Sequence, residues 1–113
     1  MKLPPDSIIA RSKITHYLLV PQPKGDKSAF LALAGYDLSK ADSLISDLRS
    51  QVLPCDAEEL ERTVYGQFYA IRAALTGPNG RVLRTRTIWI KEHLSQKTKF
   101  VTLIPERSRP HDL

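Results

Sequence analysis

Residues 65–92 read YGQFYAIRAALTGPNGRVLRTRTIWIKE and predict a long β-hairpin. On both sides of the central TGPNG segment, side chains alternate between two faces, which is the period-2 pattern of a strand. The Asn79-Gly80 pair tolerates positive φ and therefore favours a tight turn. We expect strands over 65–76 and 81–92, each with one face turned toward a core.

The chain before this hairpin favours helices. Its first segment, 2–9, contains two consecutive prolines and should be extended. Apolar side chains then recur at helical spacing in three stretches, 12–19, 27–34 and 39–52. We expect Ser12, Asp26 and Ser39 to cap these helices, and Gly35 to end the second one.

After the third helical stretch the pattern changes. Residues 56–62 are acidic and fit either a first strand or a loop, while 93–97 should form a turn and 100–104 a short strand. Residues 106–113 are polar and read as a tail. The chain therefore predicts one α+β domain over 1–113, with an ordered core of about 2–105. Two to three N-terminal helices would pack on one face of an antiparallel meander, and basic side chains would occupy the other face.

The positive charge is confined to the last third of the chain. The 113 residues carry 17 Lys and Arg against 12 Asp and Glu. Residues 1–80 hold nine of each sign, whereas residues 81–113 hold eight basic and three acidic side chains. This asymmetry indicates a surface for a polyanion or an acidic partner, although a solvated surface without a partner explains it equally well.

Several classes of protein are excluded by what the sequence lacks. It has no GxGxxG fingerprint, P-loop or nucleophile elbow, and its single cysteine, Cys55, cannot form an intrachain disulfide. The three histidines have no metal-ligand spacing, so we expect no metal and no cofactor. No apolar stretch is long enough to span a membrane, and the N-terminus does not resemble a signal peptide, so we expect a cytoplasmic protein with no membrane partner.

Two uses of the basic hairpin remain: binding alone, or cleavage of RNA without a metal. Such cleavage uses the 2′-hydroxyl of the RNA as nucleophile, and the enzyme moves protons and stabilises the phosphorane. Arginine suits a bidentate grip on phosphate oxygens, and hydroxyls can orient them. Suitable groups lie on the predicted strands and at the start of the second helix: Lys27, Arg84, Arg86, Thr87, Trp89 and Thr102.

The combination of short motifs resembles an uncharacterised bacterial domain family. The motifs are Tyr65-Gly66, the LTGPNG run at 75–80, RTIWI at 86–90 and FVT at 100–102, preceded by YLL at 17–19, KGDK at 24–27 and Gly35-Tyr36. That family is similar to the RelE–colicin–EndoU-like group of ribonuclease toxins. In this group N-terminal helices precede a four-stranded antiparallel sheet, the order derived above.

The resemblance implies a metal-independent endoribonuclease, acting as the toxin of a toxin–antitoxin pair. The polar positions that match the family's pattern are Lys27, Arg86, Thr87, Trp89 and Thr102. We expect Lys27, Arg86, Thr87 and Thr102 to be catalytic, and Arg84, Trp89, Tyr65 and Lys99 to bind RNA. His16 does not match the pattern, which favours a lysine or tyrosine as general base. The implied partners are RNA and a small acidic antitoxin or immunity protein, in a hetero-oligomer or with the chain as a homodimer. The alternatives are a non-catalytic module that binds nucleic acid or protein, and a structural partner in a larger complex.

Overall fold

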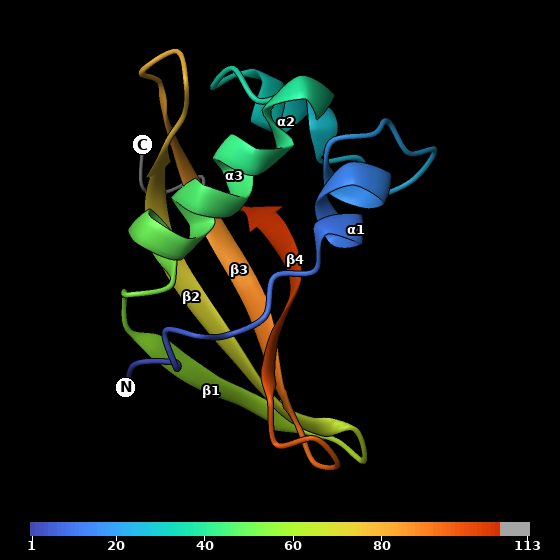
Figure 1. The fold of residues 1–113 in the computed structure, drawn as a ribbon, viewed down its shortest axis with the longest axis vertical. Coiled ribbons are helices and arrows are strands. Elements are labelled where there is room, and N and C mark those ends of the chain that lie inside the picture. Colours follow the sequence, from blue (N-terminus) through green and yellow to red (C-terminus); the bar gives the residue numbers. More distant parts are fainter. Residues whose placement is uncertain (107–113) are drawn as a thin grey trace, which may run out of the picture.

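A computed structural model describes residues 1–106 and shows helices followed by an antiparallel sheet (Figure 1). The predicted α+β class is therefore confirmed. The C-terminal tail, apart from Glu106, lies outside the described residues. The elements are α1 (Arg11–Lys13), η1 (Ile14–Leu18), α2 (Ser28–Ala32), η2 (Leu38–Lys40), α3 (Ala41–Asp47), η3 (Leu48–Val52), β1 (Ala57–Arg62), β2 (Gly66–Thr76), β3 (Val82–Glu92) and β4 (Thr98–Pro105).

The four strands lie in the order β1-β2-β3-β4, and each pair is antiparallel. The ambiguous segment 56–62 forms a strand from Ala57 onward, and the fourth strand extends two residues further in the N-terminal direction than expected. In the central hairpin Tyr69 lies opposite Trp89 and Leu75 opposite Leu83, so the odd-numbered residues of both strands share one face. We call it the inner face, and the opposite one the outer face.

The helices cover the upper part of the inner face, in front of β2 and β3 in Figure 1. Trp89 lies at the centre of the core with no exposed surface, and it meets the ring of Phe100 edge to face at 5.3 Å between centroids. Leu31 of α2, Leu44 of α3 and Leu48 of η3 are equally buried. Burying several such side chains stabilises the fold by roughly 1.5–3 kcal/mol each, which is how an amphipathic helix is held on a sheet.

The TGPNG turn docks against the C-terminal end of α2. The amide of Asn79 donates to the Ala34 carbonyl at 3.2 Å, and its side-chain amide donates to Leu33 O at 3.0 Å. A Cβ on Gly77 would lie 2.2 Å from the Ala34 carbonyl oxygen, so only glycine allows this approach. Gly35 ends the helix at φ 93°, as predicted for a C′ glycine. The turn thus joins the helical layer to the sheet.

The predicted cap of the third helix is wrong by two residues. Helical structure begins at Leu38, and the side chain of Asp37 accepts from the Ser39 amide at 3.0 Å. Ser39 itself donates its hydroxyl to the same carboxylate. Asp37 has extended backbone angles, which the Ncap position requires, so the aspartate and not the serine fills it.

The outer face carries the arginines of β2 and β3, as expected from the sequence, whereas Lys91 of β3 lies on the inner face. Arg72 and Arg84 are exposed and Arg86 is half-buried, whereas the neighbouring residues of opposite parity are buried or, at Ala73, half-buried. In β4 the alternation shifts at a bulge: Phe100 lies opposite Trp89, but Thr102 lies opposite Ile88. Val101 is therefore the extra residue, and Thr102 moves to the outer face beside the arginines.

Candidate functional site

A hollow lies at the free edge of β4, where the first helical segment and the loop before α2 approach the sheet. Three of its residues come from the outer side of β4, and the others come from α1, η1 and the end of the loop. Its lining residues are Ser12, Lys13, His16, Tyr17, Lys27, Val101, Thr102 and Ile104. Two predicted catalytic residues, Lys27 and Thr102, thus line the same hollow although 75 positions separate them in the sequence.

Tyr17 and Lys27 form the polar centre of this hollow. The Lys27 ammonium donates to the Tyr17 phenol oxygen at 3.1 Å and lies 5.4 Å from the ring centroid. Gly25, at φ 66°, turns the loop so that Lys27 comes back over η1. A Cβ on Gly25 would lie 3.5 Å from the Lys27 nitrogen. That distance is an ordinary contact, so the positive φ of the loop, and not a lack of space, is what favours glycine here.

The pKa of Tyr17 is lowered from its ordinary value. The largest cause is the hydrogen bond from Lys27, whose positive charge adds to the effect, while partial burial opposes it. Smaller lowering contributions come from the Thr102 hydroxyl and the charge of Lys13, although Tyr17 and Thr102 do not form a hydrogen bond here. Tyr17 therefore gives up its proton more readily than a free tyrosine.

Thr102 has a buried hydroxyl without a hydrogen-bond partner. The bulge at Val101 places this residue on the outer side of β4, where it lines the hollow. A buried polar atom left unpaired costs roughly 1–3 kcal/mol, so native proteins seldom leave one without a reason. A ligand oxygen in the hollow would provide the missing partner.

Arg86, on the adjacent strand β3, also has a buried polar atom without a hydrogen-bond partner. Its Nε atom is buried and makes no hydrogen bond within the described residues. Arg86 does not line the hollow, but it lies beside two residues that do. It is directly opposite Ile104 and diagonally across from Thr102. On its other side it faces Arg72, whose Nε is 3.6 Å from Glu106. The two guanidinium groups occupy directly opposed positions, and the Glu106 carboxylate offsets part of their repulsion.

Thr87 and Trp89 are not brought to this site. Both have no exposed surface and lie on the inner face, because their parity in β3 is opposite to that of Arg86. The Thr87 hydroxyl donates to Ile71 O at 3.3 Å and accepts from the Trp89 indole at 2.8 Å. Thr87 and Trp89 are therefore part of the core. A ligand could reach them for the predicted catalytic and RNA-binding roles only if the core opened.

The remaining predicted RNA-binding residues are spread over the outer face and the far end of the sheet. Arg84 is exposed near Arg86 on β3. Tyr65 is 75 % exposed in the β1–β2 turn, and Lys99 forms an ion pair with Glu92 at 2.9 Å. Glu92 lies six residues along β3 from Arg86, which is about 20 Å of extended strand. Tyr65 and Lys99 therefore cannot contact the same phosphate as Arg86.

Sequence reasoning missed Tyr17 and left His16 aside. The spacing of Tyr17 in an amphipathic helix predicts a core position, but the residue is half-buried and lines the hollow, where its hydroxyl accepts from Lys27. A tyrosine has an apolar ring and a polar tip, and spacing alone does not reveal where the tip lies. His16 also lines the hollow, with its Nδ1 3.0 Å from the Thr15 hydroxyl.

Within residues 1–106, no group of three or more His, Cys, Asp or Glu side chains is arranged to hold a metal ion. Within the same range, no helix combines the length and the apolar character needed to cross a membrane.

Fold and site together define an α+β protein with N-terminal helices, a four-stranded antiparallel sheet and a cationic, hydroxyl-bearing hollow at one sheet edge. Residues 5–107 match the family model described as "Domain of unknown function (DUF6883)", and the chain belongs to this family. Comparison with curated proteins and with solved structures found no match.

Proposed function

We propose that this protein is a metal-independent endoribonuclease with the fold of the RelE–colicin–EndoU-like toxins. The observation that carries the proposal is the set of unsatisfied and cationic groups around one hollow. Lys27 holds Tyr17 in a state that loses its proton readily, and two buried polar atoms, on Thr102 and Arg86, lack partners. A phosphodiester offers oxygen acceptors and negative charge for these groups.

The proposed reaction is attack of the ribose 2′-hydroxyl on the adjacent phosphorus. Tyr17, as its phenolate, accepts the proton of the 2′-hydroxyl while the 2′-oxygen–phosphorus bond forms. The phosphorus–5′-oxygen bond breaks, and the leaving oxygen takes a proton from Lys13 or His16, both in the hollow. The products are a 2′,3′-cyclic phosphate and a 5′-hydroxyl end.

The other groups stabilise charge. The Arg86 guanidinium donates to the phosphorane oxygens, and Thr102 donates to one of them. Lys27 lowers the pKa of Tyr17 through its hydrogen bond and charge, and it neutralises charge on the phosphate. Every step uses a side chain of this protein, so the mechanism needs no metal ion.

The test is cleavage of an end-labelled RNA by the purified protein in the presence of a strong chelator. We expect products with cyclic phosphate ends, and no cleavage where the attacking nucleotide is replaced by its 2′-deoxy form. Tyr17→Phe, Lys27→Met and Arg86→Gln should each lower the rate at least a hundredfold. Lys40→Met removes an exposed lysine from the far helical layer and is the matched control. Intact RNA with a folded sample would refute the proposal.

Retained RNA binding without cleavage would instead identify a binding module. Arg72 and Arg84, exposed on the outer face, would then bind phosphates without chemistry. Such binding should weaken steeply with added salt.

As a toxin, the protein would act on cytoplasmic RNA and be neutralised by a small acidic antitoxin. Inducible expression should arrest growth, and Arg86→Gln should relieve the arrest while the protein still accumulates. Normal growth with the wild-type chain would contradict this part of the proposal.

A further inference from the structure

A second hollow lies on the inner face, below the helical layer. The N-terminal residues 1–8 cross this part of the sheet as an irregular segment, the dark blue tube of Figure 1, and we call them the strap. The strap, the β3–β4 turn, Tyr69 and Lys91 line a hollow of about 420 Å³ that is partly open to solvent. Ligand pockets start at about 300 Å³, so a small organic molecule would fit.

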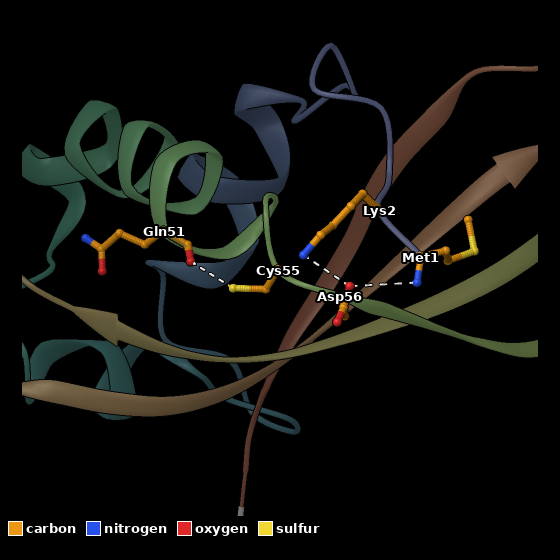
Figure 2. A network of polar contacts seen from close by, with 5 residues as sticks. All are labelled: Met1, Lys2, Gln51, Cys55 and Asp56. Atoms are coloured by element: carbon orange, nitrogen blue, oxygen red, sulfur yellow. Dashed lines mark hydrogen bonds and ion pairs between the residues drawn. The ribbon is translucent and has the colours of Figure 1, made fainter.

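The strap is held at both ends, which gives the hollow a defined shape. At one end Lys2 and the terminal amino group both approach Asp56, at 3.1 and 3.8 Å, and Figure 2 shows these contacts beside the end of η3. The Lys2 ammonium also lowers the pKa of Asp56. At the other end, Ile8 pairs in parallel with β4: its amide donates to Thr98 O at 2.8 Å, and its carbonyl accepts from the Phe100 amide.

The chemistry of the lining is amphiphilic. Lys91 and Lys97 both line the hollow, and neither forms an ion pair with any residue in 1–106. The strap adds an apolar wall from Leu3, Pro4 and Ile8. Asp6 is the acidic group of the lining, and a carboxylate can accept from a ribose hydroxyl.

The β3–β4 turn contributes a further side chain under conformational constraint. Gln96 has φ 59°, a region where glycine or asparagine is usual. The residue lines this hollow and a neighbouring polar one that also contains Arg62 and His93. Its side-chain amide donates to the His93 carbonyl at 2.8 Å, which ties the side chain to the β3–β4 turn beside the hollow.

We propose that the strap hollow binds a nucleotide through its phosphate, with Lys91 and Lys97 as the cationic partners and the strap packing against the base. The site lies on the inner face and shares no residue with the hollow around Tyr17, so it does not depend on the proposed cleavage. The phosphate belongs either to a free nucleotide or to a nucleic-acid chain.

The test is titration of the isotope-labelled protein with adenosine 5′-monophosphate, followed by amide NMR shifts. We expect shifts at Ser7, Ile8 and Gln96–Thr98, and binding at least tenfold weaker for adenosine, which lacks the phosphate. The double variant Lys91→Met/Lys97→Met should bind adenosine 5′-monophosphate at least about tenfold more weakly than the wild type. Lys40→Met should bind it as the wild type does.

A second titration uses a short oligodeoxyadenylate, which cannot be cleaved through a 2′-hydroxyl. Tighter binding than the mononucleotide identifies a nucleic-acid chain as the source of the phosphate, and weaker binding identifies a free nucleotide; both outcomes support the site. The proposal is overturned if neither probe shifts these amides at millimolar concentration, or if the double variant binds unchanged. Arg86→Gln should keep the strap shifts, so loss of cleavage and loss of this site can be told apart.

Discussion

Replacing Gly77 by alanine should separate the TGPNG turn from the helical layer. The new methyl carbon would lie 2.2 Å from the Ala34 carbonyl oxygen and 2.5 Å from its Cβ, both far inside van der Waals contact. Neither atom belongs to a flexible side chain, so the turn itself must move. That movement breaks the hydrogen bonds from Asn79 to Ala34 and Leu33.

The size of the effect can be worked out from these contacts. Overpacking costs about 1–3 kcal/mol, and two lost hydrogen bonds cost about 1 kcal/mol each. Alanine recovers roughly 0.4–1 kcal/mol by restricting the unfolded chain. We therefore expect Gly77→Ala to lower the free energy of unfolding by about 3 kcal/mol, a large fraction of a typical stability.

Gly80→Ala, three residues further on in the same turn, is the matched control. Gly80 has φ 85° but no atom within 4 Å of its would-be Cβ, so it loses only the left-handed conformation, about 1 kcal/mol. Urea denaturation followed by the fluorescence of Trp89, the one tryptophan in the chain, measures both variants. Equal losses for the two variants would refute the docking argument.

Three other predictions concern single side chains. Thr87→Val should lower the free energy of unfolding by about 1–3 kcal/mol, because the Trp89 indole loses its acceptor, but it should preserve RNA cleavage. Thr102→Val should preserve stability and lower the cleavage rate. Denaturation and cleavage assays compare the two variants, and the reverse pattern would contradict the site. Lys27→Met should raise the pKa of Tyr17, because the hydrogen bond and charge that lower it are gone; NMR titration of the tyrosine ring carbons measures this, and cleavage should then rise only at higher pH. Asp37 caps η2 and has a lowered pKa, so it stabilises the fold above its unfolded pKa near 4, and that contribution fades as pH falls through the lower folded value. Asp37→Ala should flatten this part of the stability–pH curve at lower stability, and Asp37→Asn should flatten it while keeping a cap; an unchanged curve in either variant would contradict this role.

Local signals in the sequence determine much of the fold, because they depend on neighbouring residues. Alternation over 65–92 and the Asn-Gly pair specify the hairpin, and Gly35 specifies a helix end, since each is a property of a few consecutive residues. The same alternation specifies the two faces of β3. It also implies that Arg86 and Thr87, as neighbours in a strand, cannot both face one ligand.

The tertiary structure decides which distant groups meet. Without the bulge at Val101, the pairing of Phe100 with Trp89 would place Thr102 opposite Thr87 in the core; with it, Thr102 lies opposite Ile88 on the outer face near Arg86. The loop turned by Gly25 likewise brings Lys27 to Tyr17. A bulge and a loop conformation are set by packing between elements, not by the side chains of one segment. The hairpin can therefore be derived from the sequence, but the site beside it depends on how the chain packs.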